Sequence, residues 1–153
     1  MKRISFYLLL AIVCLSSTNV FSQGTNGTYE NSTVWEVTMI NIEADIKTEF
    51  LKILNQTWEY TMTKALEQDL ILSFQILMGD ASSEKDYNII LMVENEKLGD
   101  YDPDPVRDAK WNLIKQEMIS SMGEDKYDRT MKRFKQIRKQ LSKKTLRKIN
   151  LID

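Results

Sequence analysis

The sequence predicts an α+β fold in which a four-stranded antiparallel sheet carries helices on one face. In four short segments, apolar residues alternate with polar ones or fill nearly every position. In three longer segments, they recur every three or four residues. The segments follow one another in the order β-α-β-β-α-α-β. Strands and helices mixed in this way are typical of an antiparallel sheet packed against helices.

The first predicted strand and helix lie next to each other in the chain. Residues 34–42 (VWEVTMINI) are rich in β-branched and aromatic residues, which favour a strand. Alternation places Trp35, Val37 and Met39 on one face, and we expect that face to be buried. Apolar residues at helical spacing then predict a long amphipathic helix from about residue 44 to residue 68.

The next two strands form a predicted hairpin. Residues 70–77 (LILSFQIL) and 87–94 (YNIILMVE) flank a turn that contains Gly79 and Asp80. Both strands are apolar at nearly every position, so the sheet has apolar side chains on both faces. Helices cover one face, and an apolar face of this size is not left in water. We therefore expect a homodimer in which a second copy covers the other face.

The second half of the chain predicts two helices and a last strand. Asp104 suits a helix N-cap, Pro105 the first helical position and Gly123 the end of that helix. Apolar residues at helical spacing over 127–141 indicate a further helix. Residues 146–152 (LRKINLI) alternate, which predicts the fourth strand.

The first 22 residues are typical of a cleavable secretory signal. Lys2 and Arg3 form a basic start, residues 4–15 form a largely apolar run too short to cross a bilayer, and a stretch rich in small residues (SSTNVFS) ends at Ser22. We expect cleavage after Ser22. The protein is then exported, to the periplasm or the medium of a bacterium, and it has no transmembrane segment.

The remainder of the chain divides into two parts. Residues 23–33, rich in Gly, Asn, Ser and Thr, predict a flexible arm, and residues 34–153 predict one domain. The only cysteine, Cys14, lies in the signal, and the chain contains no histidine. Common zinc, copper and iron sites and Ser-His-Asp or Cys-His catalysis therefore lack their residues. We expect neither a metal nor a cofactor.

Three aspartates in the middle of the chain have the spacing of a calcium loop. Asp100, Asp102 and Asp104 occupy alternate positions, as the first ligands of an EF-hand do. However, Pro105 stands where that loop requires glycine, and Trp111 where it requires glutamate. The pattern therefore favours a polar loop whose last aspartate caps a helix.

Charge is distributed unevenly along the chain. Residues 23–125 have a net charge of −12, whereas residues 126–148 have a net charge of +10. This basic segment contains few aromatic residues beyond Phe134, and export also argues against nucleic acid as a partner. The segment is either a solvated helix face near the acidic body or a site for an acidic partner or anionic surface.

A few aromatic and amide side chains are candidates for a ligand site. Indole rings favour apolar ligands, and amides fix the orientation of a ligand through hydrogen bonds. The alternative is that the aromatic residues are ordinary core. The candidates are Trp35, Asn41, Trp58, Asn88 and Trp111.

The order β-α-β-β-α-α-β, the strands LILSFQIL and YNIILMVE and the position of Trp35 carry a resemblance to a known superfamily. From Trp35 to Ile152 the chain resembles the ferredoxin-like dimeric α+β barrel superfamily, which includes the antibiotic-biosynthesis monooxygenases. It also resembles small exported proteins of Bacteroidota, whose leaders often end in Phe-Ser before Gln, as here at Gln23. The resemblance implies two subunits packed sheet against sheet around a cavity. Haem-dependent activities of the superfamily are not implied, because they need histidine.

These observations lead to three hypotheses of function. The first is an exported, non-enzymatic homodimer that binds a small apolar ligand between its sheets. The second is a cofactor-independent monooxygenase on the same scaffold, which needs only a water-excluding cavity and donors for a substrate anion. The third is an interaction protein that uses its basic C-terminal helix.

Overall fold

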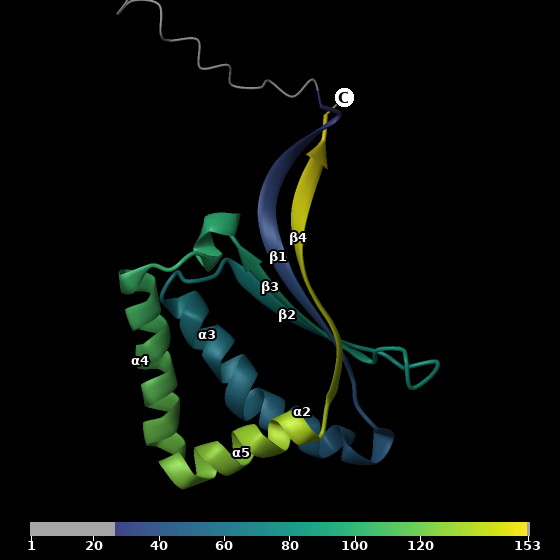
Figure 1. Cartoon of the computed structure of the whole chain (residues 1–153), viewed down its shortest axis with the longest axis vertical. Coiled ribbons are helices and arrows are strands. Elements are labelled where there is room, and N and C mark those ends of the chain that lie inside the picture. Colours follow the sequence, from purple (N-terminus) through teal and green to yellow (C-terminus); the bar gives the residue numbers. More distant parts are fainter. Residues whose placement is uncertain (1–26, 153) are drawn as a thin grey trace, which may run out of the picture. The chain divides into compact units, whose positions relative to one another are not determined.

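Residues 27–152 are described by a computed structural model and contain a four-stranded antiparallel sheet with helices (Figure 1). They divide into a main unit, residues 31–150, and a small unit of residues 27–30 with 151–152. In the small unit the Ile152 N–H donates to the Thr28 carbonyl at 2.9 Å. The predicted signal (1–22) and the first residues of the predicted arm lie outside the described residues.

The four strands form one sheet in the order β2-β3-β1-β4. β3 pairs antiparallel with both β1 and β2, so that Ile89 lies opposite Ile40 and Leu91 lies opposite Ile76. The predicted hairpin is therefore confirmed. The strands are β1 (Tyr29–Asn41), β2 (Ser73–Met78), β3 (Ile89–Asn95) and β4 (Lys139–Leu151).

The long helix predicted for residues 44–68 is confirmed, but its geometry changes along its length. It consists of η1 (Ala44–Ile46), α2 (Lys47–Leu54), a π-helical turn η2 (Asn55–Glu59) and α3 (Tyr60–Glu67). Thr57 in the π-helical turn is buried, and its hydroxyl donates to the Ile53 carbonyl at 2.7 Å. A π-helical turn is rare and is often found at functional sites.

The caps predicted for the next helix are confirmed. A short 3-10 helix, η3 (Leu98–Tyr101), leads into α4 (Pro105–Met122), which is followed by α5 (Glu124–Gln136). The Asp104 carboxylate accepts hydrogen bonds from the Val106 and Arg107 N–H groups at 2.8 and 3.0 Å. Gly123 ends α4 with φ of 81°, a conformation that glycine adopts without strain.

The end of the chain differs from the prediction. α5 ends at Gln136 instead of residue 141, and β4 begins at Lys139 instead of residue 146. Ile137 is buried and completes the apolar stripe of α5. After it, pairing of β4 along β1 satisfies the backbone, so a polar segment becomes strand. The predicted basic C-terminal helix is therefore confirmed as far as Gln136, but five of the cations of residues 126–148 lie on β4 instead of on a helix.

The same pairing lengthens the first strand. β1 begins at Tyr29, whereas the sequence predicted a start at Val34, so residues 29–33 of the predicted arm belong to a strand. The polar composition of residues 29–33 does not predict a strand. A neighbouring strand overrides weak local propensity, because it supplies the hydrogen bonds of the ladder.

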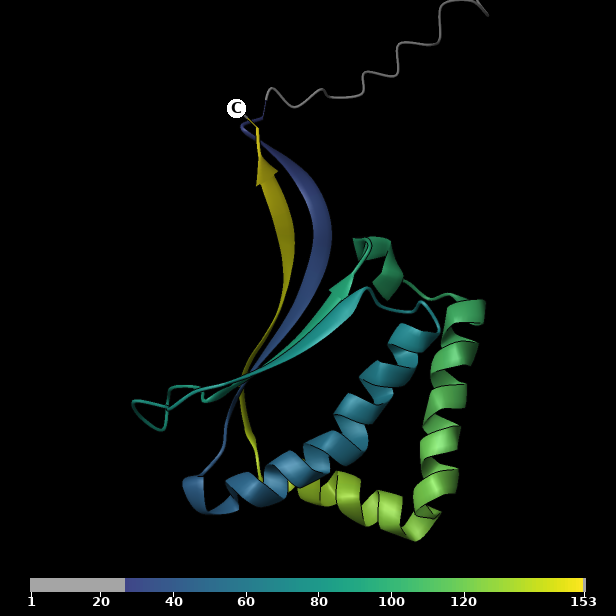
Figure 2. The same ribbon diagram turned by 180° about the vertical axis from the view of Figure 1, so that it is seen from behind.

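The main core lies between the sheet and the helices, which cover one side of β2 and β3 (Figure 2). Ile40 and Ile89 of the sheet are fully buried, as is Phe50 of α2. The Phe50 ring stacks on Phe134 of α5 with centroids 5.4 Å apart. Burial of each such side chain contributes about 1.5–3 kcal/mol. These contacts hold α2 and α5 together.

The face of β1 that enters this core is not the one predicted. In the observed register Glu36, Thr38 and Ile40 face the helices, and Trp35, Val37 and Met39 face the other way. Ile40 belongs to the core because its partner Ile89 belongs to it, as does Leu91, the partner of Thr38 on the same face. We refer to the second side of the sheet as the open face. Its apolar residues on β1 and β3 are Trp35, Val37, Met39, Ile90 and Met92, of which Val37 is buried and the others are partly exposed. Glu94 and the β2 residues Ser73, Gln75 and Leu77 lie on the same face.

Candidate functional site

A cleft of about 230 Å³ lies between the sheet, the helical segment η2–α3, the short helix η3 and α4. It is on the helix side of the sheet. Both apolar and polar side chains line it, which is the composition of sites that bind small molecules. The lining residues are Glu36, Trp58, Met62, Ile71, Val93, Asn95, Asp100, Tyr101, Arg107 and Trp111.

Two indole rings supply much of the apolar lining. Trp58 lies in the π-helical turn, and its ring meets Phe74 of β2 edge to face with centroids 5.7 Å apart. Trp111 lies on α4 and packs against a second cluster of buried residues around Ile114. Both indoles are half-buried, so each keeps surface available to a ligand.

The polar part of the cleft is a hydrogen-bonded group of three side chains at the ends of three elements. Asn95, at the end of β3, is only 5% exposed. Its amide nitrogen donates to the Tyr101 hydroxyl at 2.9 Å, and its amide oxygen accepts from Arg107 Nη2 at 3.3 Å. Arg107 Nη2 also donates to the Leu70 carbonyl. We refer to these three side chains as the Asn95 network.

The phenol of Tyr101 stays protonated over a wider pH range than usual. Burial raises the pKa of Tyr101, and the nearby carboxylate of Glu36 raises it further. The hydrogen bond from Asn95 lowers this pKa, but less than burial raises it. Tyr101 is therefore a hydrogen-bond donor at neutral pH.

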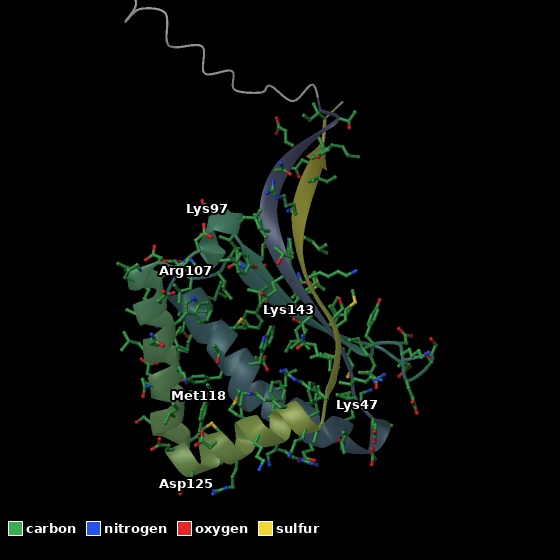
Figure 3. All side chains as sticks on the ribbon, in the orientation of Figure 1. Lys47, Lys97, Arg107, Met118, Asp125 and Lys143 are labelled. Atoms are coloured by element: carbon green, nitrogen blue, oxygen red, sulfur yellow. The ribbon has the colours of Figure 1, made fainter. Side chains whose placement is uncertain are left out.

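The charges that line the cleft nearly cancel. Arg107 is positive, and Glu36 and Asp100 are negative. Lys143 of β4 forms an ion pair with Glu36 at 2.9 Å. The positions of Arg107 and Lys143 are labelled in Figure 3. The Asp100 carboxylate accepts from the Lys97 N–H at 3.1 Å. The cleft thus has polar groups without a strong net charge.

This cleft contains two of the five predicted ligand residues, Trp58 and Trp111. Trp35 lies on the open face, on the opposite side of the sheet. Asn88 binds the backbone of Ile42, accepting at 3.0 Å and donating at 2.7 Å. Asn41 donates to the Asp86 carbonyl at 2.6 Å. The last two amides thus anchor the hairpin loop outside the cleft.

Sequence reasoning did not identify the Asn95 network. Asn95 is the last residue of a strand, and Tyr101 and Arg107 flank a loop that was interpreted only as a cap or a calcium loop. A single signal was available, namely polar residues concentrated between the end of one strand and the start of a helix. Such positions often carry binding residues.

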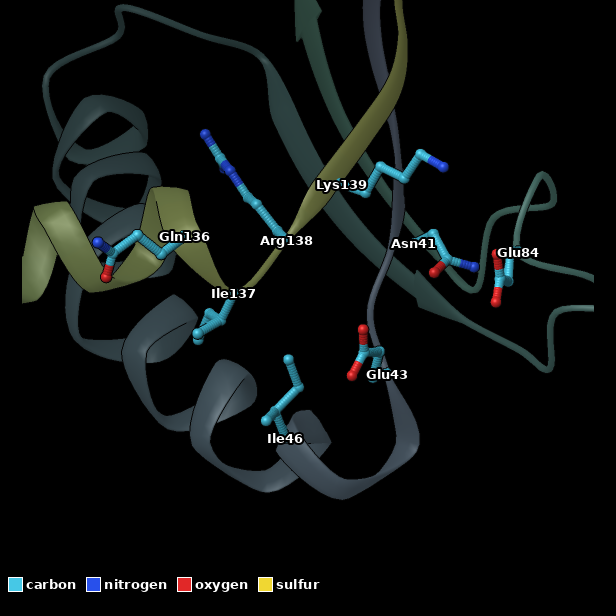
Figure 4. Close-up of a pocket in the computed structure, with 8 residues that line it drawn as sticks. All are labelled: Asn41, Glu43, Ile46, Glu84, Gln136, Ile137, Arg138 and Lys139. Carbon is cyan, nitrogen blue, oxygen red and sulfur yellow. The ribbon is translucent and has the colours of Figure 1, made fainter.

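A second hollow, of about 340 Å³, lies where α5 meets β4 (Figure 4). It is lined by carboxylates of Glu43 and Glu84 and by the cation of Lys139. The Arg138 guanidinium points away from Lys139 and Glu84 in Figure 4 and lies over the Phe134 ring, 4.2 Å from its centroid. Burial lowers the pKa of Arg138. The polar groups of this hollow do not converge on one point.

The aspartates with calcium-loop spacing serve other purposes. Asp104 caps α4, and Asp100 accepts a backbone N–H within η3. Among residues 27–152 no group of three acidic or metal-binding side chains is placed to hold a metal ion. The observed hydrogen bonds thus account for the carboxylates of Asp100 and Asp104 at the starts of two helices.

Comparisons with protein family models, with curated proteins and with solved structures give no match for this chain. In the described part of the chain, no helix combines the length and the apolar character needed to span a membrane. The class that the fold defines is therefore a small α+β protein, and its function has to be argued from the cleft and the sheet.

Proposed function

We propose that this protein is an exported, non-enzymatic domain that binds a small, largely apolar molecule in the cleft and forms a homodimer through its open face. The observation that supports the proposal is the convergence of Trp58, Trp111 and the Asn95 network on one cleft. Aromatic walls bind an apolar molecule, and a few fixed donors orient it. At about 230 Å³ the cleft suits a ligand of about two fused rings.

We place the ligand in the helix-side cleft, whereas the sequence hypothesis placed it between the sheets of two subunits. A ligand between two sheets needs the open face, whereas the two tryptophans that converge lie on the helix side. The π-helical turn that presents Trp58 also supports the cleft, because such turns often mark functional sites. The open face is then available for association.

The arrangement of the strands supports a ferredoxin-like topology. The chain order β-α-β-β-α-α-β and the sheet order β2-β3-β1-β4 are those of a split β-α-β fold with one added helix. On the open face Trp35, Met39, Ile90 and Met92 keep part of their apolar surface exposed. A second copy removes this surface from water, which drives association.

Equilibrium dialysis with N-phenyl-1-naphthylamine, an uncharged apolar probe, tests the cleft. Val93 lines the cleft, so Val93→Phe fills it, and we expect at least a tenfold loss of affinity. Met92 is its neighbour on the opposite face of β3, so Met92→Phe is the matched control and retains binding. Equal binding by the wild-type protein and a folded Val93→Phe variant refutes the proposal.

Sedimentation velocity tests the homodimer. Ile90→Lys places a charge on the open face, and we expect a dimer of the wild-type chain to become a monomer. Leu113→Lys changes a residue of α4 that is 60% exposed, and it leaves the dimer intact. A wild-type monomer at micromolar concentration contradicts the homodimer, but it does not contradict ligand binding in the cleft.

A cofactor-independent monooxygenase is the second candidate, and the Asn95 network favours it. Tyr101 and Arg107 are donors of the kind that stabilise a substrate anion on its way to reaction with oxygen. Oxygen uptake with dithranol, an oxygen-reactive phenolic probe, tests this activity. Uptake above the buffer rate that Tyr101→Phe abolishes supports an enzyme, and uptake at the buffer rate excludes this reaction.

A further inference from the structure

We infer that the ligand of the cleft carries an uncharged carbonyl group, whose oxygen accepts a hydrogen bond from the Tyr101 hydroxyl. The inference rests on the proposed function, since it specifies the chemistry of the ligand that the cleft binds. It follows from the direction of the hydrogen bonds in the Asn95 network and from the charges around it.

The first step is the orientation of the Asn95 side chain. A guanidinium group only donates hydrogen bonds, so the atom of Asn95 that faces Arg107 Nη2 at 3.3 Å has to be the amide oxygen. The amide nitrogen then faces Tyr101 Oη, at 2.9 Å. Because Asn95 is buried, a flipped amide would leave its nitrogen facing a cation, at high cost.

The second step is the hydrogen of Tyr101. The amide nitrogen has no lone pair to offer, so the Tyr101 oxygen accepts and its own O–H points elsewhere. Within residues 27–152 this O–H has no acceptor among the hydrogen bonds observed. Tyr101 is 43% exposed and lines the cleft, so the donor is available to a ligand.

The third step is the strength of this donor. Arg107 donates to Asn95, Asn95 donates to Tyr101, and Tyr101 has a hydrogen to donate in turn. Hydrogen bonds arranged head to tail polarise one another, so the chain that starts at the guanidinium strengthens the last O–H. An oxygen acceptor gains most from such a donor.

The fourth step is the charge of the ligand. Arg107 alone favours an anion, but Nη2 is already shared by the Asn95 oxygen and the Leu70 carbonyl. Glu36 and Asp100 line the same cleft and oppose a carboxylate. A positively charged ligand group cannot accept a hydrogen bond from the Tyr101 hydroxyl. A neutral carbonyl on an apolar frame matches both the donor and the charge.

Isothermal titration calorimetry with three two-ring probes tests the inference. 2-Acetonaphthone carries the carbonyl, 2-isopropenylnaphthalene replaces its oxygen by a CH2 group of similar shape, and 2-naphthoate carries a negative charge. For the wild-type chain we expect the ketone to bind about tenfold more tightly than the alkene, the effect of one good hydrogen bond. The carboxylate binds more weakly than the ketone.

The variant Tyr101→Phe removes only the hydroxyl. We expect it to bind ketone and alkene equally, with the affinity for the alkene unchanged, which also shows that the cleft is intact. Tyr127→Phe, on α5 outside the cleft, is the matched control and keeps the tenfold preference.

Three outcomes overturn the inference. Equal binding of ketone and alkene by the wild-type chain refutes the carbonyl while it leaves the proposed ligand cleft standing. Tighter binding of 2-naphthoate than of the ketone refutes the uncharged ligand. A chain that binds neither the two-ring probes nor N-phenyl-1-naphthylamine refutes the proposed function itself, and the inference with it.

Discussion

Replacement of the buried amide in Asn95→Leu removes the centre of the Asn95 network. The 2.9 Å hydrogen bond to Tyr101 joins neutral groups and contributes about 1 kcal/mol. The 3.3 Å bond from Arg107 involves a charge but is long, so we assign it about 1.5 kcal/mol. Leucine has the same branching and number of heavy atoms as asparagine, and burial of its apolar surface contributes about 1 kcal/mol of stability. We therefore expect a loss of about 1.5 kcal/mol in the free energy of unfolding.

Urea unfolding followed by circular dichroism measures this loss. With a typical slope of about 1–3 kcal/mol per molar urea, the midpoint falls by roughly 0.5–1.5 M. Asn112→Leu, at an exposed position on α4, is the matched control and changes the free energy by less than about 0.5 kcal/mol. A midpoint of Asn95→Leu equal to or above that of the wild-type chain refutes the reasoning.

A double-mutant cycle of Asn95→Leu with Tyr101→Phe isolates the hydrogen bond between them. We expect a coupling energy of about 1 kcal/mol, because the two side chains are in direct contact. No coupling would mean that the bond adds nothing to stability.

Two further predictions concern stability. Asp104→Ala removes the cap of α4 and costs about 1 kcal/mol in urea unfolding, whereas Asp102→Ala, beside it in the same loop, has no comparable effect. Hydrogen bonds from Thr33 and Ser73 lower the pKa of Glu94. The folded pKa lies below the unfolded one, so this stability is present above about pH 4.3 and is lost as the pH falls through the folded pKa. Ser73→Ala reduces that acid-dependent loss in unfolding measured between pH 7 and pH 3, and an unaltered pH profile contradicts the assignment.

The sequence was informative wherever local chemistry decides the structure. The cap at Asp104, the end of α4 at Gly123 and the amphipathic pattern of residues 44–67 all act within a few residues, so pattern and propensity revealed them. β4 was mistaken in part for helix because its backbone is satisfied by a strand far away in the sequence. Long-range pairing leaves little trace in local composition.

The site was harder to predict for the same reason. Trp58 and Trp111 were identified as candidates by residue type, and the fold brings them together. Trp35 was assigned to the core from the alternation of residues 34–42. Alternation shows that the two faces of a strand differ, but the pattern does not show which face the helices cover. The Asn95 network joins three residues whose proximity arises only when β3, η3 and α4 meet.

The placement of the three tryptophans gives the protein two independent fluorescence signals. Trp58 and Trp111 line the cleft, and Trp35 lies across the sheet on the open face. We expect the proposed ligand to quench the first two, whereas the proposed association through the open face shifts the emission of the third. In Trp35→Phe only the emission of Trp58 and Trp111 remains, so ligand entry can be followed by itself without any added label.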